Sequence, residues 1–214
     1  MKYVFYVIGI LILTLGISLT ILSDIGTTPF DALLVGLSIK IGLTVGSWEI
    51  ILALILICCN SFLKRNRPEI LGLLTAFITG IGLDMWLFLL HFFITPDLWY
   101  SKLICFGIGL ILVGLGTATY LHTNFAPIPV DRLTLVIQEL SRTSVFFSRT
   151  IIYLVFLIMA LIFNGPIGIG TILTVCLGGG ILNYFMPLIK KVIDPVLRHS
   201  STTRNFDNDK NHFI

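Results

Sequence analysis

The sequence predicts an all-α membrane protein made of about six membrane-spanning helices. Of its 214 residues 56% are hydrophobic and 12% are charged, whereas soluble domains carry about 25% charged residues. The apolar runs are also continuous over about 20 residues, as in Tyr3–Leu22, which is the length that a spanning helix needs. Strands of membrane barrels would instead alternate apolar and polar residues. Helices are therefore the expected elements.

Six apolar segments have the length of a span, and two further stretches have a helical pattern but are too short. Pro29–Ile41 and Pro129–Leu140 each reach only about 20 Å, against about 30 Å of hydrocarbon. They are expected to be half-helices, either re-entrant or lying along the interface. The six expected spans are about 3–22, 47–63, 70–93, 102–121, 146–163 and 168–189.

The distribution of basic residues predicts that both termini are cytoplasmic. With six spans, twelve basic residues fall on the side of the N-terminus and two, Lys40 and Lys102, fall on the other. Cytoplasmic loops are enriched in Lys and Arg. Residues 1–198 are expected to form a single membrane domain, and the polar segment 199–214 a disordered cytoplasmic tail. The twelve basic residues are Lys2, Lys64, Arg65, Arg67, Arg132, Arg142, Arg149, Lys190, Lys191, Arg198, Arg204 and Lys210.

The chain repeats itself after one hundred positions, so that repeat 1 covers about 3–93 and repeat 2 about 102–190. Each repeat holds three spans. Because three is odd, the second repeat enters the membrane upside down, as in many secondary transporters. If the short helices also span, the repeats are parallel instead. The aligned residues include Gly9, Gly16, Pro29 and Asp31 with Gly109, Gly116, Pro129 and Asp131.

Each short helix begins with a P-x-D motif, formed by Pro29 and Asp31 in repeat 1 and by Pro129 and Asp131 in repeat 2. Two interpretations are open. Proline and aspartate suit the first turn of a helix, with Thr28 as the N-cap. Alternatively, two inverted helix starts meet near the midplane, where they line a path for a solute or an ion. Ala126-Pro127-Ile128 precedes the second motif, which therefore lacks a hydroxyl cap.

Asp84 lies inside the third expected span, where the repeat resumes after a one-residue gap and aligns Asp84 with Asn183. A carboxylate deep in a span is costly and usually functional, so the pair is expected to line one cavity from opposite sides. The alternative is a hydrogen bond between closely packed helices. Glu49 and Arg149 also align across the repeat and are expected to be interfacial charges.

Several function classes lack support in the sequence. The sequence has no basic stripe interleaved with aromatic residues, which is the pattern that suggests nucleic-acid binding. The four cysteines lie in apolar runs without metal-ligand spacing, so neither a metal nor a cofactor is expected. No H-E-x-x-H or P-loop motif is present, and we do not expect an enzyme.

Three motifs together resemble the YczE/YitT-type family of bacterial membrane proteins, and most closely its YczE branch. They are a G-T-T-P-F-D loop after a glycine-containing first span, the stretch Ala32–Ser38, and a G-x-G-T run from Gly168 to Thr171. The resemblance extends to about Leu197 and implies a multi-pass protein of the bacterial plasma membrane. It does not define a solute, because the family carries no assigned activity.

Taken together, these features lead us to expect a secondary-type transporter or exporter of a small solute or ion. The alternative is an accessory or substrate-capture subunit of a larger membrane transport or biosynthetic complex. The lipid bilayer is the expected environment, and a homo-oligomer or a membrane partner protein is compatible with either function. The candidate path residues are Thr28, Pro29, Asp31, Asp84, Pro129, Asp131 and Asn183.

Overall fold

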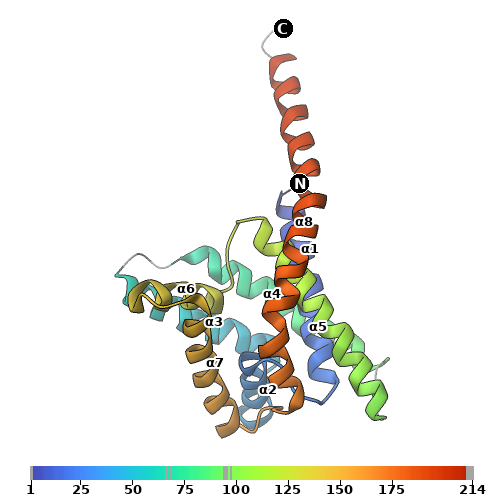
Figure 1. Cartoon of the computed structure of the whole chain (residues 1–214), viewed down its shortest axis with the longest axis vertical. Helices are drawn as coiled ribbons and strands as arrows, with labels where there is room; N and C mark the ends of the chain where they lie inside the picture. Colours follow the sequence, from blue (N-terminus) through green and yellow to red (C-terminus); the bar gives the residue numbers. More distant parts are fainter. Residues whose placement is uncertain (1, 66, 68, 94–95, 97, 211–214) are drawn as a thin grey trace.

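The computed structural model describes residues 2–65, 67, 69–93, 96 and 98–210, with side chains up to residue 195. These residues form eight helices and no strand, arranged as in Figure 1. Six of the helices are long and apolar enough to cross a membrane, which confirms the expected fold class. The helices are α1 (Lys2–Leu22), α2 (Pro29–Ile41), α3 (Val45–Lys64), α4 (Ile70–His91), α5 (Trp99–His122), α6 (Pro129–Ser141), α7 (Val145–Ile162) and α8 (Ile169–Lys210).

Glycines bring α1 and α5 into direct backbone contact. A Cβ added at Gly9 would lie 2.7 Å from the backbone nitrogen of Tyr120, and one added at Gly16 would lie 2.5 Å from that of Val113. From the N-terminal to the C-terminal end of α1, the contacts on α5 run from its C-terminal to its N-terminal end. The two helices are therefore antiparallel. Small residues at such interfaces let helices approach closely in a membrane.

The same contacts recur after a shift of one hundred residues. A Cβ at Gly116 would meet the backbone nitrogen of Leu13, just as one at Gly16 would meet that of Val113. The short helices also make equivalent contacts in the two halves, since α2 packs on α7 and α6 packs on α3. Each short helix thus contacts the middle span of the other half of the chain.

The contact between α3 and α4 in the first half has no equivalent between α7 and α8 in the second half. In the first half α4 packs along α3, with Gly80 against Gly46. In the second half α8 packs mainly on α5, and a Cβ at Gly178, Gly179 or Gly180 would meet nothing within 4 Å. The helices α7 and α8 are therefore separated where α3 and α4 touch.

The segment before α8 packs against the start of α2. Gly26 has a φ of 114°, which favours glycine, and a Cβ there would lie 2.7 Å from the backbone nitrogen of Gly168. The Gly170 N–H donates to the Ile25 carbonyl at 3.0 Å. The G-T-T-P-F-D loop and the G-x-G-T run are therefore in contact, although they lie far apart in the sequence.

Helix α8 continues to Lys210 and projects beyond the rest of the bundle (Figure 1). It contains Pro187 and Pro195, and no Gly or Pro that would end a helix follows Pro195 up to Lys210. The helix therefore includes residues 199–210, which belong to the segment that we expect to be a disordered cytoplasmic tail. Residues 211–214 lie outside the described part of the chain.

Candidate functional site

The first P-x-D motif forms a capped helix start. Thr28 is the N-cap of α2, and Pro29 occupies the first turn. The Thr28 hydroxyl accepts from the Asp31 N–H at 3.2 Å and donates to the Asp31 carboxylate at 2.5 Å. Asp31 is only 5% exposed, so these hydroxyl contacts compensate in part for the loss of water around its carboxylate.

The second P-x-D motif is held by side chains from two spans. The Ile128 N-cap makes no side-chain bond, as expected, and Pro129 again lies in the first turn. Asp131 instead accepts from the Tyr120 hydroxyl at 2.6 Å and from the Arg149 guanidinium at 3.3 Å. Asp131 is therefore part of an ion pair rather than only a helix start.

Arg149 is the centre of this arrangement, and it has more partners than an isolated interfacial charge would have. Its Nε donates to the Tyr153 hydroxyl at 3.2 Å while its terminal nitrogen reaches Asp131. Arg149 thus joins Tyr153 to Asp131, and no hydrogen bond or ion pair of the described residues joins Asp131 to Asp31.

Glu49 occupies the position that matches Arg149 in the first repeat, and its side chain is buried, with 3% exposed. Among the described residues it forms no ion pair, whereas Arg149 pairs with Asp131. The two halves therefore differ at this position, because the second half has an arginine paired with an aspartate and the first half has a buried carboxyl group.

A cavity of about 570 Å³ opens between α5, α7 and α8, within the usual size range of small-molecule sites. Arg149 and Tyr153 line it, and Gly178–Gly180 form part of the α8 wall. Each P-x-D aspartate lies behind a lining residue, since Thr28 bonds Asp31 and Arg149 bonds Asp131. Further polar lining residues are Thr20, Thr28, Thr117, Thr150, Thr174 and Asn183.

Asp84 and Asn183 do not face each other across this cavity. The Asp84 carboxylate accepts from the Gly46 N–H at 2.8 Å and from the Thr44 hydroxyl at 2.6 Å. It therefore caps the start of α3. This is the alternative in which Asp84 makes a hydrogen bond between closely packed helices. Asn183 does line the cavity. The pair is apart because α4 packs on α3, whereas α8 stands away from α7.

Sequence reasoning missed the two residues that carry the site, Arg149 and Tyr153. A signal for Arg149 was present, since it is the basic residue aligned with Glu49 at the start of an apolar run. Tyr153 gave no signal, because a tyrosine in such a run is also typical of the interface. Within the described residues no group of three metal-ligating side chains occurs.

The fold and the cavity define a multi-pass α-helical membrane protein. The chain belongs to the family described as "Family of unknown function (DUF6198)", which matches residues 1–187. This agrees with the resemblance to the YczE branch, because one relative is the "Uncharacterized membrane protein YczE" of Bacillus subtilis (strain 168). That protein is 35% identical over 87% of this chain and 86% of its own length.

Two further relatives match nearly the same region. The "Uncharacterized protein YyaS" of Bacillus subtilis (strain 168) is 63% identical over 89% of this chain and 95% of its own length. An "Uncharacterized protein" of Haemophilus influenzae is 26% identical over 85% of this chain and 81% of its own length. No solved structure matches the chain.

Proposed function

We propose that the chain is a secondary-type transporter or exporter of a small polar solute, and not an enzyme. The observation that carries this proposal is the cavity of about 570 Å³ between spanning helices with Arg149 in its wall. An ionisable residue inside a membrane protein is expensive and usually marks a substrate or ion path. We place the protein in the bacterial plasma membrane with both termini in the cytoplasm, as the distribution of basic residues favours.

In this proposal Arg149 is the main solute-binding group. Asp131 and Tyr153 hold its guanidinium at the cavity wall, and a guanidinium has five N–H donors. Donors that these partners leave free can bind an acceptor on the solute, and the threonine hydroxyls around the cavity can bind its other polar groups. Asp131 balances the charge of Arg149, so a neutral or zwitterionic solute fits as well as an anion.

The unequal packing of the two halves supports alternating access. We interpret the recurring α1 and α5 contacts as those of two inverted repeats. In the first repeat α3 and α4 are in contact, whereas in the second repeat α7 and α8 are separated. In inverted-repeat transporters one repeat rocks against the other around a fixed site. Closure of α8 onto α7, together with opening of α4 from α3, would then expose the cavity to the opposite side.

A ligand-stabilisation screen tests the proposal. The wild type and Arg149→Lys are purified in detergent, and their unfolding temperatures are followed against metabolites, ions and antibiotics. A solute bound by the native state raises the unfolding temperature. Lysine keeps the charge but loses the planar fork of donors, so we expect a ligand that stabilises the wild type and loses most of its effect on Arg149→Lys.

The matched control is Arg142→Gln, which changes an exposed arginine outside the cavity. It should respond to the ligand like the wild type. A ligand that stabilises all three proteins equally would contradict the role of Arg149. If no ligand in the library stabilises the wild type, the binding-site interpretation of the cavity fails for those classes of solute.

The second candidate function is an accessory or substrate-capture subunit. It is favoured by the exposed apolar surface of α8, where Ile172, Leu177 and Tyr184 are 66%, 47% and 67% exposed, because a membrane partner could cover such a surface. Reconstitution separates the two functions. A transporter moves the stabilising ligand into liposomes by itself, whereas a capture subunit binds it but moves it only with its partner present.

A further inference from the structure

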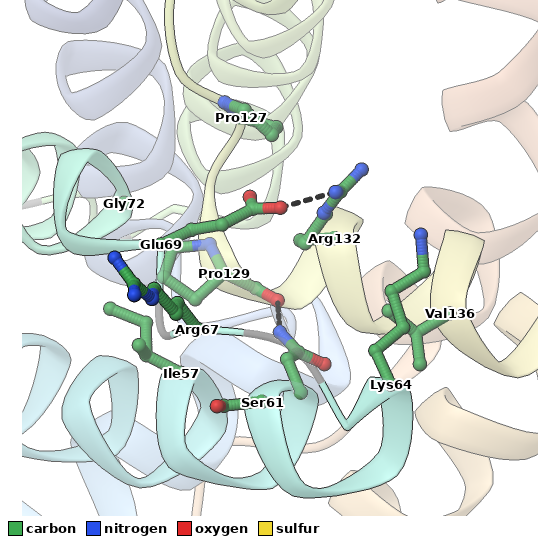
Figure 2. Close-up of a pocket in the computed structure, with 11 residues that line it drawn as sticks. Ile57, Ser61, Lys64, Arg67, Glu69, Gly72, Pro127, Pro129, Arg132 and Val136 are labelled. Atoms are coloured by element: carbon green, nitrogen blue, oxygen red, sulfur yellow. Dashed lines mark hydrogen bonds and ion pairs between the residues drawn. The ribbon is translucent and has the colours of Figure 1, made fainter.

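A second hollow lies at the basic end of the bundle, between the end of α3 and the starts of α4 and α6 (Figure 2). Its lining runs from the exposed Arg67 and Glu69 to the buried Asn60 and Val136. The hollow has a volume of about 30 Å³, which holds about two water-sized groups. It is separate from the cavity that contains Arg149.

Asn60 has an unsatisfied acceptor in this hollow. The residue is 8% exposed, and its Nδ2 donates to the Pro129 carbonyl at 3.2 Å. Its Oδ1 is buried without a hydrogen-bond partner among the described residues. Buried polar atoms almost always have a partner, so a molecule that donates a hydrogen bond is expected here.

The matching place in the other half of the chain is filled. One hundred residues after Asn60 stands Ala160, and its Cβ would lie 3.4 Å from a Cβ added at Gly165. The loop around Gly165 packs directly on the backbone of Ala32. The hollow at Asn60 is therefore a local feature of one half and not a consequence of the repeated fold.

Basic side chains surround the mouth of the hollow. Arg132 pairs with Glu69, and Figure 2 shows Glu69 between Arg67 and Arg132. Lys64 pairs with Glu139 at 2.8 Å and holds the pKa of that carboxyl below its usual range. Arg67 forms no ion pair within the described part of the chain, so one positive charge in this group is left without a counter-ion.

We propose that this hollow binds a glycerol phosphate headgroup, and that an anionic glycerophospholipid supplies it. The phosphate lies at the mouth, where Arg67 and Arg132 donate to its oxygens. A glycerol hydroxyl enters the hollow and donates to Asn60 Oδ1. Basic pockets between membrane helices bind anionic headgroups in this way, and arginine suits phosphate because of its planar fork of donors.

The apolar surface beside the hollow favours a lipid over a free phosphate ester. Phe62 at the end of α3 is 85% exposed, and Ile70 and Leu71 at the start of α4 are 74% and 52% exposed. These side chains lie at the ends of two spans, which is the depth at which acyl chains begin below a headgroup. A bound lipid would therefore cover apolar surface while its headgroup contacts the basic residues.

Native mass spectrometry of the full-length protein in a mild detergent tests the proposal. The titrants are phosphatidylglycerol and phosphatidylmethanol with the same acyl chains, phosphatidylcholine, and soluble glycerol 3-phosphate. Phosphatidylmethanol keeps the charged phosphate but lacks the headgroup hydroxyls. We expect the wild type to bind phosphatidylglycerol most tightly, and Arg67→Gln to weaken that binding about fivefold to tenfold.

The matched control is Arg142→Gln, which removes one charge from the same end of the bundle outside the hollow and should leave the affinity unchanged. Asn60→Leu should abolish the preference for phosphatidylglycerol over phosphatidylmethanol. Because Arg67 is exposed, its substitution is not expected to disturb folding, and its variant remains informative even if Asn60→Leu does not fold.

Three results would overturn the proposal. The hydroxyl contact is wrong if the wild type binds phosphatidylglycerol and phosphatidylmethanol equally, in which case water fills the hollow. The phosphate contact is wrong if Arg67→Gln behaves like Arg142→Gln. The lipid source is wrong if glycerol 3-phosphate displaces phosphatidylglycerol at comparable concentrations, since the hollow then takes free phosphate esters.

Discussion

At the scale of single residues, the two halves differ at the position of Arg149. Asp131 has Arg149 at 3.3 Å, whereas the position matching Arg149 in the first half is Glu49. The pair Asp131–Arg149 is partly exposed, with 29% and 38% of the side chains accessible. Each member therefore depends on the other for only part of the compensation of its charge.

This pairing predicts a coupled effect on stability. Arg149→Gln leaves Asp131 without its cation, and we expect a destabilisation of about 1–3 kcal/mol, at the lower end because the pair is partly exposed. The double variant Arg149→Gln/Asp131→Asn leaves no unpaired charge and should recover most of that loss. Unfolding in detergent of the wild type, both single variants and the double variant measures this coupling. Additive effects would show that the ion pair contributes nothing.

Asp84 and Asn183 are expected to respond differently, although the repeat aligns them. Asp84 caps α3 through Gly46 and Thr44, so Asp84→Ala should lower the stability by about 0.5–2 kcal/mol, as removal of an N-cap does. Asn183 is exposed at the cavity, so Asn183→Ala should leave the unfolding temperature unchanged and alter only ligand binding. A loss of ligand binding in Asp84→Ala at unchanged stability would reverse these assignments.

At the scale of the elements, the contact between α1 and α5 organises the bundle. Gly109 and Gly107 lie two residues apart on α5, but only Gly109 faces α1. A Cβ at Gly109 would lie 2.8 Å from the Gly16 carbonyl oxygen, whereas one at Gly107 would meet nothing within 4 Å. The two glycines therefore offer a matched test of this interface.

We expect Gly109→Ala to destabilise the protein by about 1–3 kcal/mol, because the backbones must move apart. Gly107→Ala should be neutral or stabilising by up to about 1 kcal/mol, because alanine is the better helix former. Thermal unfolding of both variants under the same detergent conditions is the measurement. Equal effects in the two variants would mean that α1 and α5 are not in backbone contact.

Much of the element level was predictable, because it depends on local signals. Six apolar runs, prolines in the first turn of the short helices and the Thr28 cap each specify a helix or its start without reference to distant residues. The separation of Asp84 from Asn183 was not predictable, because it depends on which helices pack together.

At the scale of the whole molecule, the separation of α7 from α8 produces the cavity. An internal repeat predicts equivalent packing in both halves, so the sequence alone did not indicate this difference. One local difference accompanies this separation. Gly46 lets α4 approach α3, whereas the residue one hundred positions later is Phe146, which lines the cavity. Phe146 is 78% exposed, so closure of α8 onto α7 would require its side chain to move aside.

The proposed path requires that the cavity between α5, α7 and α8 holds water and a polar solute, rather than lipid. Cys176 on α8 lines it, whereas Cys58 on α3 is exposed outside it and Cys105 is buried. Two variants follow from this arrangement. One keeps Cys176 as its single cysteine and the other keeps Cys58, with the remaining cysteines changed to alanine.

The most direct measurement is the rate at which a charged, water-soluble thiol reagent labels each variant in proteoliposomes. Only a thiol in contact with water forms the reactive thiolate. If the cavity holds water, we expect Cys176 to be labelled about tenfold faster than Cys58. A ligand from the stabilisation screen should slow the labelling of Cys176 alone. Equal, slow labelling of both cysteines would show that the cavity is not open to water and would contradict the proposed path.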